Sequence, residues 1–360
     1  MVTSEFPPQP GGIGNHAYNL AKHLQLNSFL VNVIADNRSF SGEAEHTFDA
    51  ELKFSIHRIV RYSIRLLMYL KRLTTLFRLI KTSEVIFASG KFSLWIVAFS
   101  SLFYKRQCIA IIHGSEVNFN NTLLKTSIHW SLKRFSKVIA VSNFTKSLVS
   151  HLNLKDIVVI PNGFDAEKWN LDNNTILKLK GQPKLITVGN VTERKGQLNV
   201  IQLLPELIKV YPDLHYHCVG IPTQKDAFLK TANLLKVENY ITFHGKVTDE
   251  HLQKLLQSSD VFVMLSSSTK TGDVEGFGIA LIEANALGLP AIGAIGCGIE
   301  DAINPEKSGL LVPYGNPDVF IEALKQILNH YDRFKNGAKH WANQLTWENV
   351  IKHYIKEIEV

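Results

Sequence analysis

The chain has 360 residues, of which 45% are hydrophobic and 20% charged, and its net charge is +7. This is the composition of an ordinary globular protein with a substantial core, and the length favours two domains over one. The three cysteines (Cys108, Cys218 and Cys297) show no metal-ligand spacing, so we expect buried thiols in a reducing cytosol.

Neither a secretory signal nor a membrane-spanning helix is predicted. Residues 1–8 lack the basic and apolar regions of a signal peptide. The most apolar stretch, 92–104, is short and contains three serines. We therefore expect a cytoplasmic protein, peripheral at the inner face of the membrane if its basic region contacts lipid.

The first half of the chain alternates predicted strands and helices. Only Met1–Thr3 precedes the polar run 4–8, so either the first strand is very short or the natural start lies upstream. The alternation continues to a turn signal at Pro161–Gly163 and predicts an α/β domain over 1–164. The predicted strands are 29–35, 85–88, 108–112, 137–141 and 157–160, and the predicted helices are 13–26, 92–104, 123–135 and 143–151.

A glycine-rich loop, Gly11–Gly14, precedes the first helix. Glycines let the backbone approach a ligand closely, and amides at a helix start attract anions. The loop has neither the dinucleotide-binding fingerprint nor the Walker pattern. Taken alone, it is explained best by an ordinary helix-capping turn.

Positive charge is concentrated in the first half. Residues 1–170 contain 20 Lys and Arg against 11 Asp and Glu, whereas 171–360 contain 19 against 21. Basic residues interleave with apolar ones over 57–81, which indicates a basic amphipathic helix or helix pair. It either packs on the core with a solvated basic face or meets an anionic membrane or acidic acceptor. Nucleic acid is not expected as a partner, because no nucleic-acid motif is present. The basic residues are Arg58, Arg61, Arg65, Lys71, Arg72, Arg78 and Lys81.

His113 ends an apolar strand and precedes Gly114. A lone histidine is more often structural than catalytic. The carboxyl end of an inner strand, however, is where parallel α/β sheets bind ligands. The nucleophile elbow Gly-x-Ser-x-Gly is absent, which argues against an acyl hydrolase.

The second half repeats the alternation after a polar stretch, 165–182, that is predicted to be a linker. Strand–helix alternation in both halves implies two parallel-sheet domains with right-handed crossovers. The tail 341–360 has a helical pattern. The predicted strands are 185–188, 215–219, 240–243, 261–265, 290–293 and 310–312, and the clearest helices are 197–210, 249–257, 278–287 and 317–329.

Two cations, Arg194 and Lys195, follow the first strand of this half in a glycine-bounded loop. A loop between a strand and a helix lies at the ligand-binding edge of a parallel sheet. Arginine as a fork and lysine as a point charge suit a diphosphate. The alternative is a pair of solvated surface charges.

Glu275 and Glu283 lie eight residues apart behind an apolar strand, with glycines at 276 and 278. On helical geometry this spacing spans about 12 Å, roughly the length of a sugar, a diphosphate and a ribose. Amides at the helix start would face an anion. The alternative is a helix-start acid followed by a solvated helix face.

Five short motifs thus lie in order along the chain, each at a junction between a strand and a helix. They resemble, in the same order, motifs of the family 4 retaining glycosyltransferases, and the similarity runs from the first residues to about residue 330. The motifs are Gly11–Gly14, His113 with Gly114, Pro161–Gly163, Arg194–Gly196, and Glu275 with Glu283.

The resemblance implies an α/β fold of the GT-B type, with two Rossmann-like parallel-sheet domains facing a deep interdomain cleft. It makes 1–164 the acceptor-side domain, 165–342 the nucleotide-sugar-binding domain, and 343–360 a helix that crosses back to the first domain. It further implies the transfer of a hexose from a UDP- or GDP-linked sugar to an acceptor hydroxyl. The anomeric configuration would be retained, with no metal or other cofactor.

In such enzymes cations and amides stabilise the departing diphosphate, one glutamate holds the sugar hydroxyls and the other holds the ribose. The base would rest near Val247, and the glycine loop would face the donor phosphates or the acceptor. The implied catalytic residues are His113, Arg194, Lys195 and Glu275, and the implied donor-binding residues are Gly12, Gly14, Val247, Gly276, Phe277, Gly278 and Glu283.

The resemblance also implies a sugar or lipid-linked saccharide acceptor and a role in cell-surface polysaccharide or glycolipid synthesis. Asp273 and Val274 resemble a pattern of mannosyltransferases that use GDP-mannose, which favours that donor. Three alternatives stay open: a nucleotide-sugar epimerase or a sugar phosphorylase on the same scaffold, or a catalytically silent nucleotide-sugar-binding protein.

Overall fold

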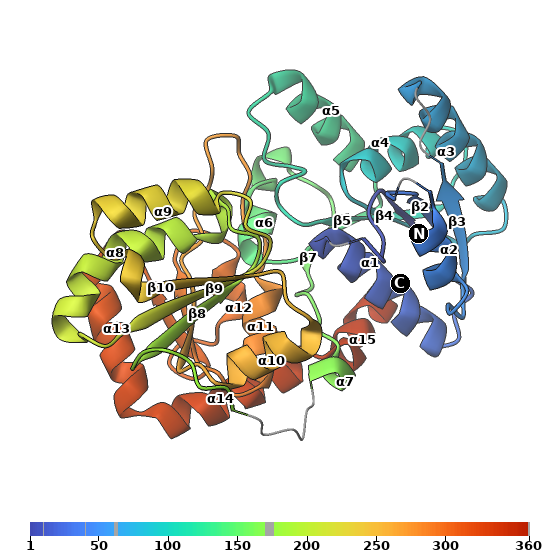
Figure 1. Cartoon of the computed structure of the whole chain (residues 1–360). Coiled ribbons are helices and arrows are strands. Elements are labelled where there is room, and N and C mark those ends of the chain that lie inside the picture. The colour runs from blue at the N-terminus through green and yellow to red at the C-terminus, as the bar shows by residue number, and fades with distance from the viewer. Residues whose placement is uncertain (10, 40, 61–63, 170–175, 359–360) are drawn as a thin grey trace. The chain divides into compact units, whose positions relative to one another are not determined.

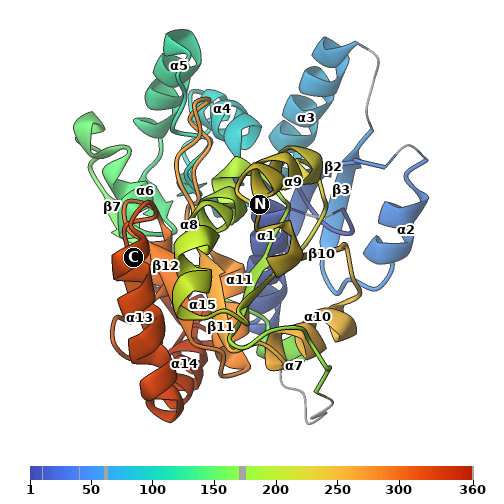
Figure 2. The same ribbon diagram turned by 60° about the vertical axis from the view of Figure 1, so that its left-hand side comes forward.

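A computed structural model describes the whole chain except residues 10, 40, 61–63, 170–175 and 359–360. The chain divides into two compact units, shown from two sides in Figure 1 and Figure 2. Unit 1 contains Met1–Gly163 and Trp347–Val360, and unit 2 contains Phe164–Thr346. Both are α/β units with parallel sheets, which confirms the predicted fold class.

The described strands of unit 1 form a seven-stranded parallel sheet in the order β3-β2-β1-β4-β5-β6-β7. The run from Cys108 to Ile112 in β5 is fully buried, as expected for a parallel sheet with both faces covered. The first strand is indeed very short, yet it lies between β2 and β4. The strands are β1 Val2–Thr3, β2 Asn32–Asp36, β3 Ser55–Ile59, β4 Val85–Ser89, β5 Gln107–Ile112, β6 Lys137–Ala140 and β7 Ile157–Val159.

Helices cover this sheet, and the basic region is split between two kinds of element. Its first part is the edge strand β3, which pairs with β2, so the prediction of helix throughout 57–81 is wrong there. Arg61 lies outside the described residues. The helices of unit 1 are α1 Gly12–Leu26, α2 Glu43–Asp49, α3 Arg65–Leu79, α4 Lys91–Ser100, α5 Thr122–Leu132, α6 Asn143–Ser147, the 3-10 helix η1 Ser150–Leu152 and α15 Trp347–Ile358.

Helix α15, from the end of the chain, packs against α1 inside unit 1. Trp347 and Tyr354 on α15 are fully buried. A Cβ on Gly163 would lie 2.9 Å from the Trp347 ring, so this glycine makes room for the indole. At the other end of the helix, the Gln107 side-chain amide donates to the Glu357 carbonyl (3.1 Å). These contacts fix the position of α15 on unit 1.

The described strands of unit 2 form a six-stranded parallel sheet in the order β10-β9-β8-β11-β12-β13. Its central strands are short apolar runs that are buried on both faces. All six strands lie within two residues of their predicted bounds. They are β8 Lys184–Val188, β9 His215–Val219, β10 Ile241–Gly245, β11 Val261–Met264, β12 Ala291–Ala294 and β13 Gly309–Val312.

The helices of unit 2 fill the intervals between strands, and α8 and α9 lie side by side in both views (Figures 1 and 2). Helices were expected between the strands, but no bounds were predicted for α9, and most of α14 was not predicted. The predicted linker contains the short helix α7, and its residues 170–175 lie outside the described residues. The helices are α7 Ala166–Trp169, η2 Glu193–Lys195, α8 Gln197–Val210, α9 Lys225–Leu234, η3 Glu238–Tyr240, α10 Asp249–Gln257, α11 Ile279–Ala286, α12 Ile299–Ala302, α13 Pro317–Asn329 and α14 Tyr331–Gln344.

Two further predictions can be compared with the structure. The three cysteines are free and buried, as predicted. Within the described part of the chain, no helix has both the length and the apolar character needed to cross a bilayer.

Candidate functional site

Two loops at the carboxyl edge of the unit 2 sheet meet because their strands, β8 and β11, are neighbours. The β8 loop contains η2 and ends at Gly196, which has a φ of 78°. A Cβ on Gly196 would lie 2.1 Å from the Leu265 carbonyl oxygen, in the loop after β11. Only glycine allows this close approach, which places the two cations of one loop beside the acids of the other.

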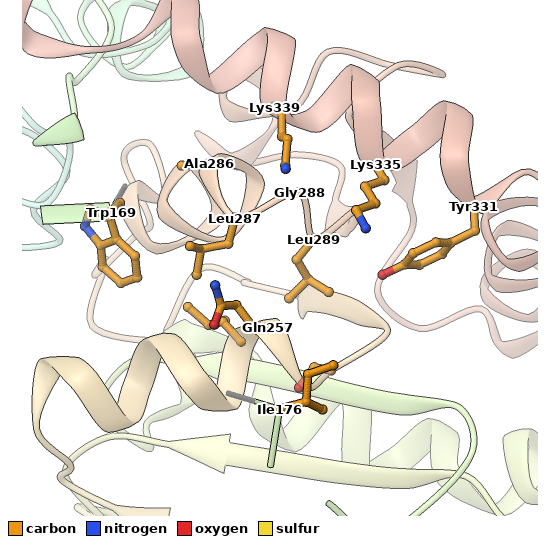
Figure 3. A pocket seen from close by; sticks show the side chains of 12 residues that line it. Trp169, Ile176, Gln257, Ala286, Leu287, Gly288, Leu289, Tyr331, Lys335 and Lys339 are labelled. Atoms are coloured by element: carbon orange, nitrogen blue, oxygen red, sulfur yellow. The ribbon is translucent and has the colours of Figure 1, made fainter. Parts of the chain in front are cut away.

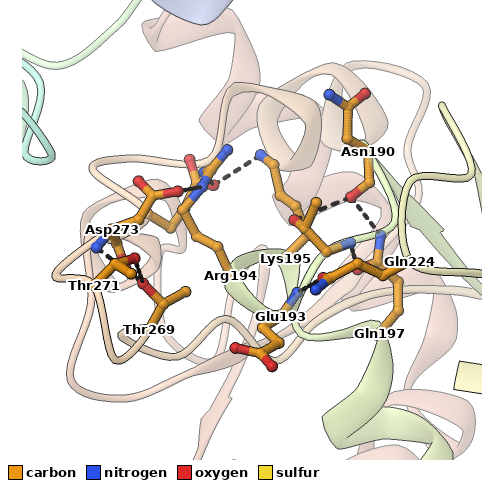
Figure 4. A network of polar contacts seen from close by, with 11 residues as sticks. Asn190, Glu193, Arg194, Lys195, Gln197, Gln224, Thr269, Thr271 and Asp273 are labelled. Atoms are coloured by element: carbon orange, nitrogen blue, oxygen red, sulfur yellow. Dashed lines mark hydrogen bonds and ion pairs between the residues drawn. The ribbon is translucent and has the colours of Figure 1, made fainter. Parts of the chain in front are cut away.

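The two cations converge on Glu275. The Lys195 Nζ lies 2.7 Å from a Glu275 carboxylate oxygen, and an Arg194 NH group donates to the same oxygen. The Arg194 Nε is also 3.0 Å from a carboxylate oxygen of Asp273, as Figure 4 shows. The structure therefore brings together three sequence-predicted residues, Arg194, Lys195 and Glu275. Asp273 joins them, although the sequence analysis had used it only to favour a particular donor.

Neutral polar side chains hold the backbone of the two loops. The Asn199 side-chain amide donates to the Leu265 carbonyl (2.7 Å), and the Gln197 amide donates to the carbonyl of Asn190 (3.2 Å). The Gln224 side-chain oxygen accepts from the backbone N–H of Glu193 (2.8 Å; Figure 4). Sequence reasoning missed these residues, because single amide side chains carry no recognisable motif.

Glu275 is ionised in this setting although it is only 8% exposed. Burial by itself would raise the pKa of its carboxyl. Lys195, Arg194 and the backbone amide of Gly278 outweigh burial and hold the pKa below its usual value. The cluster therefore combines a buried carboxylate with two cations at the edge of the sheet.

The residues after Glu275 start helix α11. The Glu275 carbonyl accepts from the Gly298 amide (2.9 Å), and Gly278, with a φ of 95°, is the N-cap. Gly276 is buried, and the Phe277 side chain is 1% exposed, within the core. Because the helix begins only at Ile279, the distance between the two glutamates is not a purely helical rise.

Glu283 lies on α11, half-buried, with the Trp169 side chain as its hydrogen-bond partner. The charged groups near Glu283 are Lys168, Asp249 and Lys195. Lys168 and Asp249 form an ion pair with each other (2.8 Å). Burial raises the pKa of the Glu283 carboxyl to about 7, with Lys168 opposing and Asp249 adding to the shift. Unlike Glu275, this carboxyl titrates near neutral pH.

Val247, the predicted base-binding position, is half-buried in the loop after β10. The end of β10 is held beside the end of β9, because the Gly220 amide, just after β9, donates to the Gly245 carbonyl (2.9 Å). The loop therefore follows a third strand of the same sheet edge.

In unit 1, His113 follows β5 directly and is half-buried. Its Nε2 lies 3.0 Å from the hydroxyl of Ser89, at the end of β4, and its backbone N–H donates to the Glu116 carboxylate. Burial lowers the pKa of His113 to about 4, so the imidazole is neutral. Burial also raises the pKa of Glu116 to about 7.

The two candidate glycines of unit 1 differ. A Cβ on Gly14 would lie 3.0 Å from the backbone of Glu5 and Phe6, so Gly14 is required for packing. A Cβ on Gly12 would meet nothing within 4 Å. The space beside Gly12, at the start of α1, is open to solvent or to a ligand.

A separate pocket of about 270 Å³ in unit 2 contains no sequence-predicted site residue (Figure 3). It lies where α10 and α11 end, with the α14 side chains of Tyr331, Lys335 and Lys339 on one wall. Trp169, the hydrogen-bond partner of Glu283, also lines it.

Family models match both halves of the chain. The model described as "Glycosyltransferase Family 4" matches residues 10–168, and the model described as "Glycosyl transferases group 1" matches residues 171–341. Together they cover nearly the whole chain.

The chain is also similar to individual proteins along most of its length. It is 24% identical, over 95% of the chain and 93% of the relative, to a GDP-mannose-dependent alpha-(1-6)-phosphatidylinositol monomannoside mannosyltransferase from Mycolicibacterium smegmatis. It is 30% identical, over 46% of the chain and 40% of the relative, to the amylovoran biosynthesis glycosyltransferase AmsK from Erwinia amylovora. The solved structure of HepE from Anabaena in complex with UDP-glucose has a TM-score of 0.80, with 18% identity over 99% of this chain and 98% of that one. The likeness to such structures supports the GT-B fold.

Proposed function

Because the chain belongs to the glycosyl transferases group 1, within glycosyltransferase family 4, we propose that it transfers a hexose from a nucleoside diphosphate sugar to an acceptor hydroxyl. The transfer would retain the anomeric configuration and need no metal. The observation that carries the proposal is the convergence of Arg194 and Lys195 on one edge of the unit 2 sheet, beside the buried Glu275.

Departure of the nucleoside diphosphate places new negative charge on its oxygens. Arg194 and Lys195 would stabilise that charge, as fixed cations do most effectively in a partly buried site. In the structure, both cations are ion-paired with Glu275. The diphosphate would replace part of this pairing, and the ionised Glu275 carboxylate would then accept hydrogen bonds from the sugar hydroxyls.

Glu283 would hold the ribose of the donor. Two carboxylate oxygens can accept paired hydrogen bonds from a vicinal diol, but only in the ionised form. Since the pKa of Glu283 is raised to about 7, we expect donor affinity to rise with pH around neutrality. The nucleotide base would rest on the loop at Val247, and the amides of Gly276 and Gly278 would face the phosphates.

His113 of unit 1 would contact the transferred sugar as a neutral hydrogen-bonding group. Its low pKa supports this role over that of a cation, because a charged imidazole is disfavoured in its buried setting. The open space at Gly12 would accommodate a donor phosphate or the acceptor, and Gly14 would support that loop from behind.

For the donor, we propose GDP-mannose. Asp273 and Val274 match the pattern of mannosyltransferases, and the relative from Mycolicibacterium smegmatis is named for this donor. The acceptor would be a sugar or lipid-linked saccharide in cell-surface polysaccharide or glycolipid synthesis, by analogy with the relatives' names.

A lipid-linked acceptor would require a cytoplasmic enzyme that binds the membrane surface peripherally, through the basic region 57–81. Helix α3 supports this role, because Leu66, Leu67 and Leu70 are 63%, 47% and 49% exposed. Exposed Lys71 and Arg78 follow on the same helix. Apolar and cationic side chains on one helix are typical of a surface that binds anionic lipid.

The test begins with a panel of UDP- and GDP-linked sugars in a thermal-shift assay, because a ligand that binds the folded state raises the melting temperature. Candidate acceptors are then added with the donor that binds, and release of the nucleoside diphosphate is measured. Turnover that persists with a chelator and gives a product of unchanged anomeric configuration supports the proposal.

Other outcomes identify the alternatives. Sugar phosphate formed with inorganic phosphate as the sole acceptor indicates a phosphorylase. A changed nucleotide sugar without any acceptor indicates an epimerase, and binding without turnover indicates a silent binding protein. Cosedimentation with vesicles of phosphatidylglycerol, but not with those of phosphatidylcholine, tests the membrane surface separately.

A further inference from the structure

A buried histidine of unit 1 connects the C-terminal helix to His113. His16 lies on α1, five residues after Gly11, and is 1% exposed. Its Nε2 is 2.9 Å from the hydroxyl of Tyr354 on α15. The His16 ring also packs edge-to-face against the His113 ring, with the ring centroids 4.9 Å apart. His16 therefore touches both His113 and a residue 338 positions away in the chain.

Burying an imidazole at this position costs folding free energy. Position 16 lies on the buried face of α1, beside Ala17 and Leu20. Among the described residues, the His16 Nδ1 has no hydrogen-bond partner although it is buried. An unpaired buried polar atom is rare in folded proteins and calls for an explanation beyond packing.

Two contacts restrict the His113 ring. The Ser89 hydroxyl meets its Nε2 at 3.0 Å, and the His16 ring lies against it. The orientation of His16 depends in turn on the Tyr354 hydroxyl and on Trp347, whose ring centroid lies 5.2 Å from that of His16. A change at Tyr354 can therefore reach His113 through a single intermediate ring.

Both imidazoles are neutral. Burial lowers the pKa of His16 well below its usual value, and the neighbouring His113 lowers it further. Tyr354 also stays protonated, because burial raises its pKa. The three side chains thus position one another by hydrogen bonding and ring packing, without formal charge.

We propose that His16 and Tyr354 are positioning residues for His113, and that helix α15 is thereby part of the transfer machinery of unit 1. Neither residue is assigned to the reaction by the motifs that placed His113. The inference rests on the proposed function, since it takes His113 as a group that contacts the transferred sugar.

Two variants separate the contacts. Tyr354→Phe removes only the hydroxyl and leaves the rings in place. His16→Gln keeps a polar group that can reach Tyr354 but removes the ring that packs on His113. Each is expected to lower kcat by between about 10-fold and 100-fold with little change in the KM of the donor, because small misplacements of a reacting group have effects of this size. The double variant should fall no further than His16→Gln, since both act through one contact.

Tyr216→Phe is the matched control. Tyr216 is also fully buried, and its hydroxyl donates to the Thr187 hydroxyl (2.7 Å) within unit 2. The Tyr216→Phe variant loses one buried hydrogen bond, as Tyr354→Phe does. Its kcat should match the wild type once the folded fraction is taken into account.

A second readout does not depend on turnover. In protein labelled with 15N at histidine, Tyr354→Phe should shift the imidazole signals of His113, and Tyr216→Phe should leave them in place. Unchanged His113 signals together with unchanged kcat in Tyr354→Phe overturn the inference. If the wild type turns over no nucleotide sugar, the proposed function fails, and the His113 signals alone then decide whether the two residues position this ring.

Discussion

The candidate sites of the two units handle charge in opposite ways. In unit 2, Glu275 is buried as an anion against Arg194 and Lys195. In unit 1, the half-buried His113 and the fully buried His16 are both uncharged. Arg194 and Lys195 can therefore respond to negative charge on a ligand, whereas His113 can act only as a neutral hydrogen-bonding group.

The largest effect is expected from the cations of unit 2. Lys195→Ala or Arg194→Ala should lower kcat with the identified donor by about 100-fold to 1000-fold, because a fixed group that stabilises transition-state charge is lost. Steady-state nucleoside diphosphate release measures this. Lys230→Ala, at an exposed position on α9, is the control and should keep wild-type turnover. Equal turnover in all three variants would contradict the charge-stabilising role of Arg194 and Lys195.

A smaller effect, on stability, separates the two glycines of unit 1. Gly14→Ala should lower the free energy of unfolding by about 1–3 kcal/mol, because its Cβ would press on the backbone of Glu5 and Phe6. Gly12→Ala has open space around it and should leave stability unchanged or slightly increased. Denaturant titration measures both. Loss of activity in a stable Gly12→Ala protein would support a ligand at that loop, and a stable Gly14→Ala protein would contradict the packing.

The pH dependence of donor binding tests Glu283. Its folded pKa of about 7 lies above the ordinary value of 4.5, so the carboxylate that would accept the ribose hydroxyls is lost as pH falls through 7. Between pH 8 and pH 6, donor affinity should weaken by roughly ten-fold, because the ionised fraction of a group with a pKa of about 7 falls from about nine-tenths to about one-tenth. Calorimetry measures it, and Glu283→Gln should bind weakly at both values. A pH-independent Kd in the wild type argues against this role.

The same shift has a consequence for stability. A carboxyl with a raised folded pKa binds its proton more tightly in the folded state, so its stabilising contribution is complete below about pH 4.5 and is lost as pH rises through 7. Glu283→Gln should flatten the stability profile over this interval.

The smallest effect is expected from an exposed ion pair in the same unit. Lys254 and Glu250 lie four residues apart on α10, with the Nζ 2.6 Å from the carboxylate. Lys254→Ala should change the free energy of unfolding by no more than about 0.5 kcal/mol, because water screens such pairs. A larger loss in thermal unfolding would contradict the screening of this pair by water.

Much of the fold could be predicted because parallel strands are short apolar runs with recognisable periodicity. The strands of unit 2 were predicted to within two residues, and the buried cysteines followed from their apolar surroundings. The edge strand β3 was missed because it carries the polar residues of an edge, His57 and Arg58, and its alternation was taken as part of a basic helix.

The candidate site was predicted in part. Arg194, Lys195 and Glu275 belong to local motifs beside strands, and the structure brings them together. Asp273 as an ion-pair partner of Arg194 had no comparable signal. His16 also gave none, because a histidine among apolar positions of a helix resembles an ordinary core residue.

The sequence alone determined the parallel α/β class of both units and the loops that carry the charged groups, because those features depend on neighbours along the chain. Which loops meet and which charges are paired, by contrast, depends on the tertiary structure. Adjacency of β8 and β11, the close approach at Gly196 and the return of α15 onto α1 all join residues far apart in sequence. Burial then set the protonation of Glu283, His16 and His113, since desolvation depends on the complete surroundings of a group.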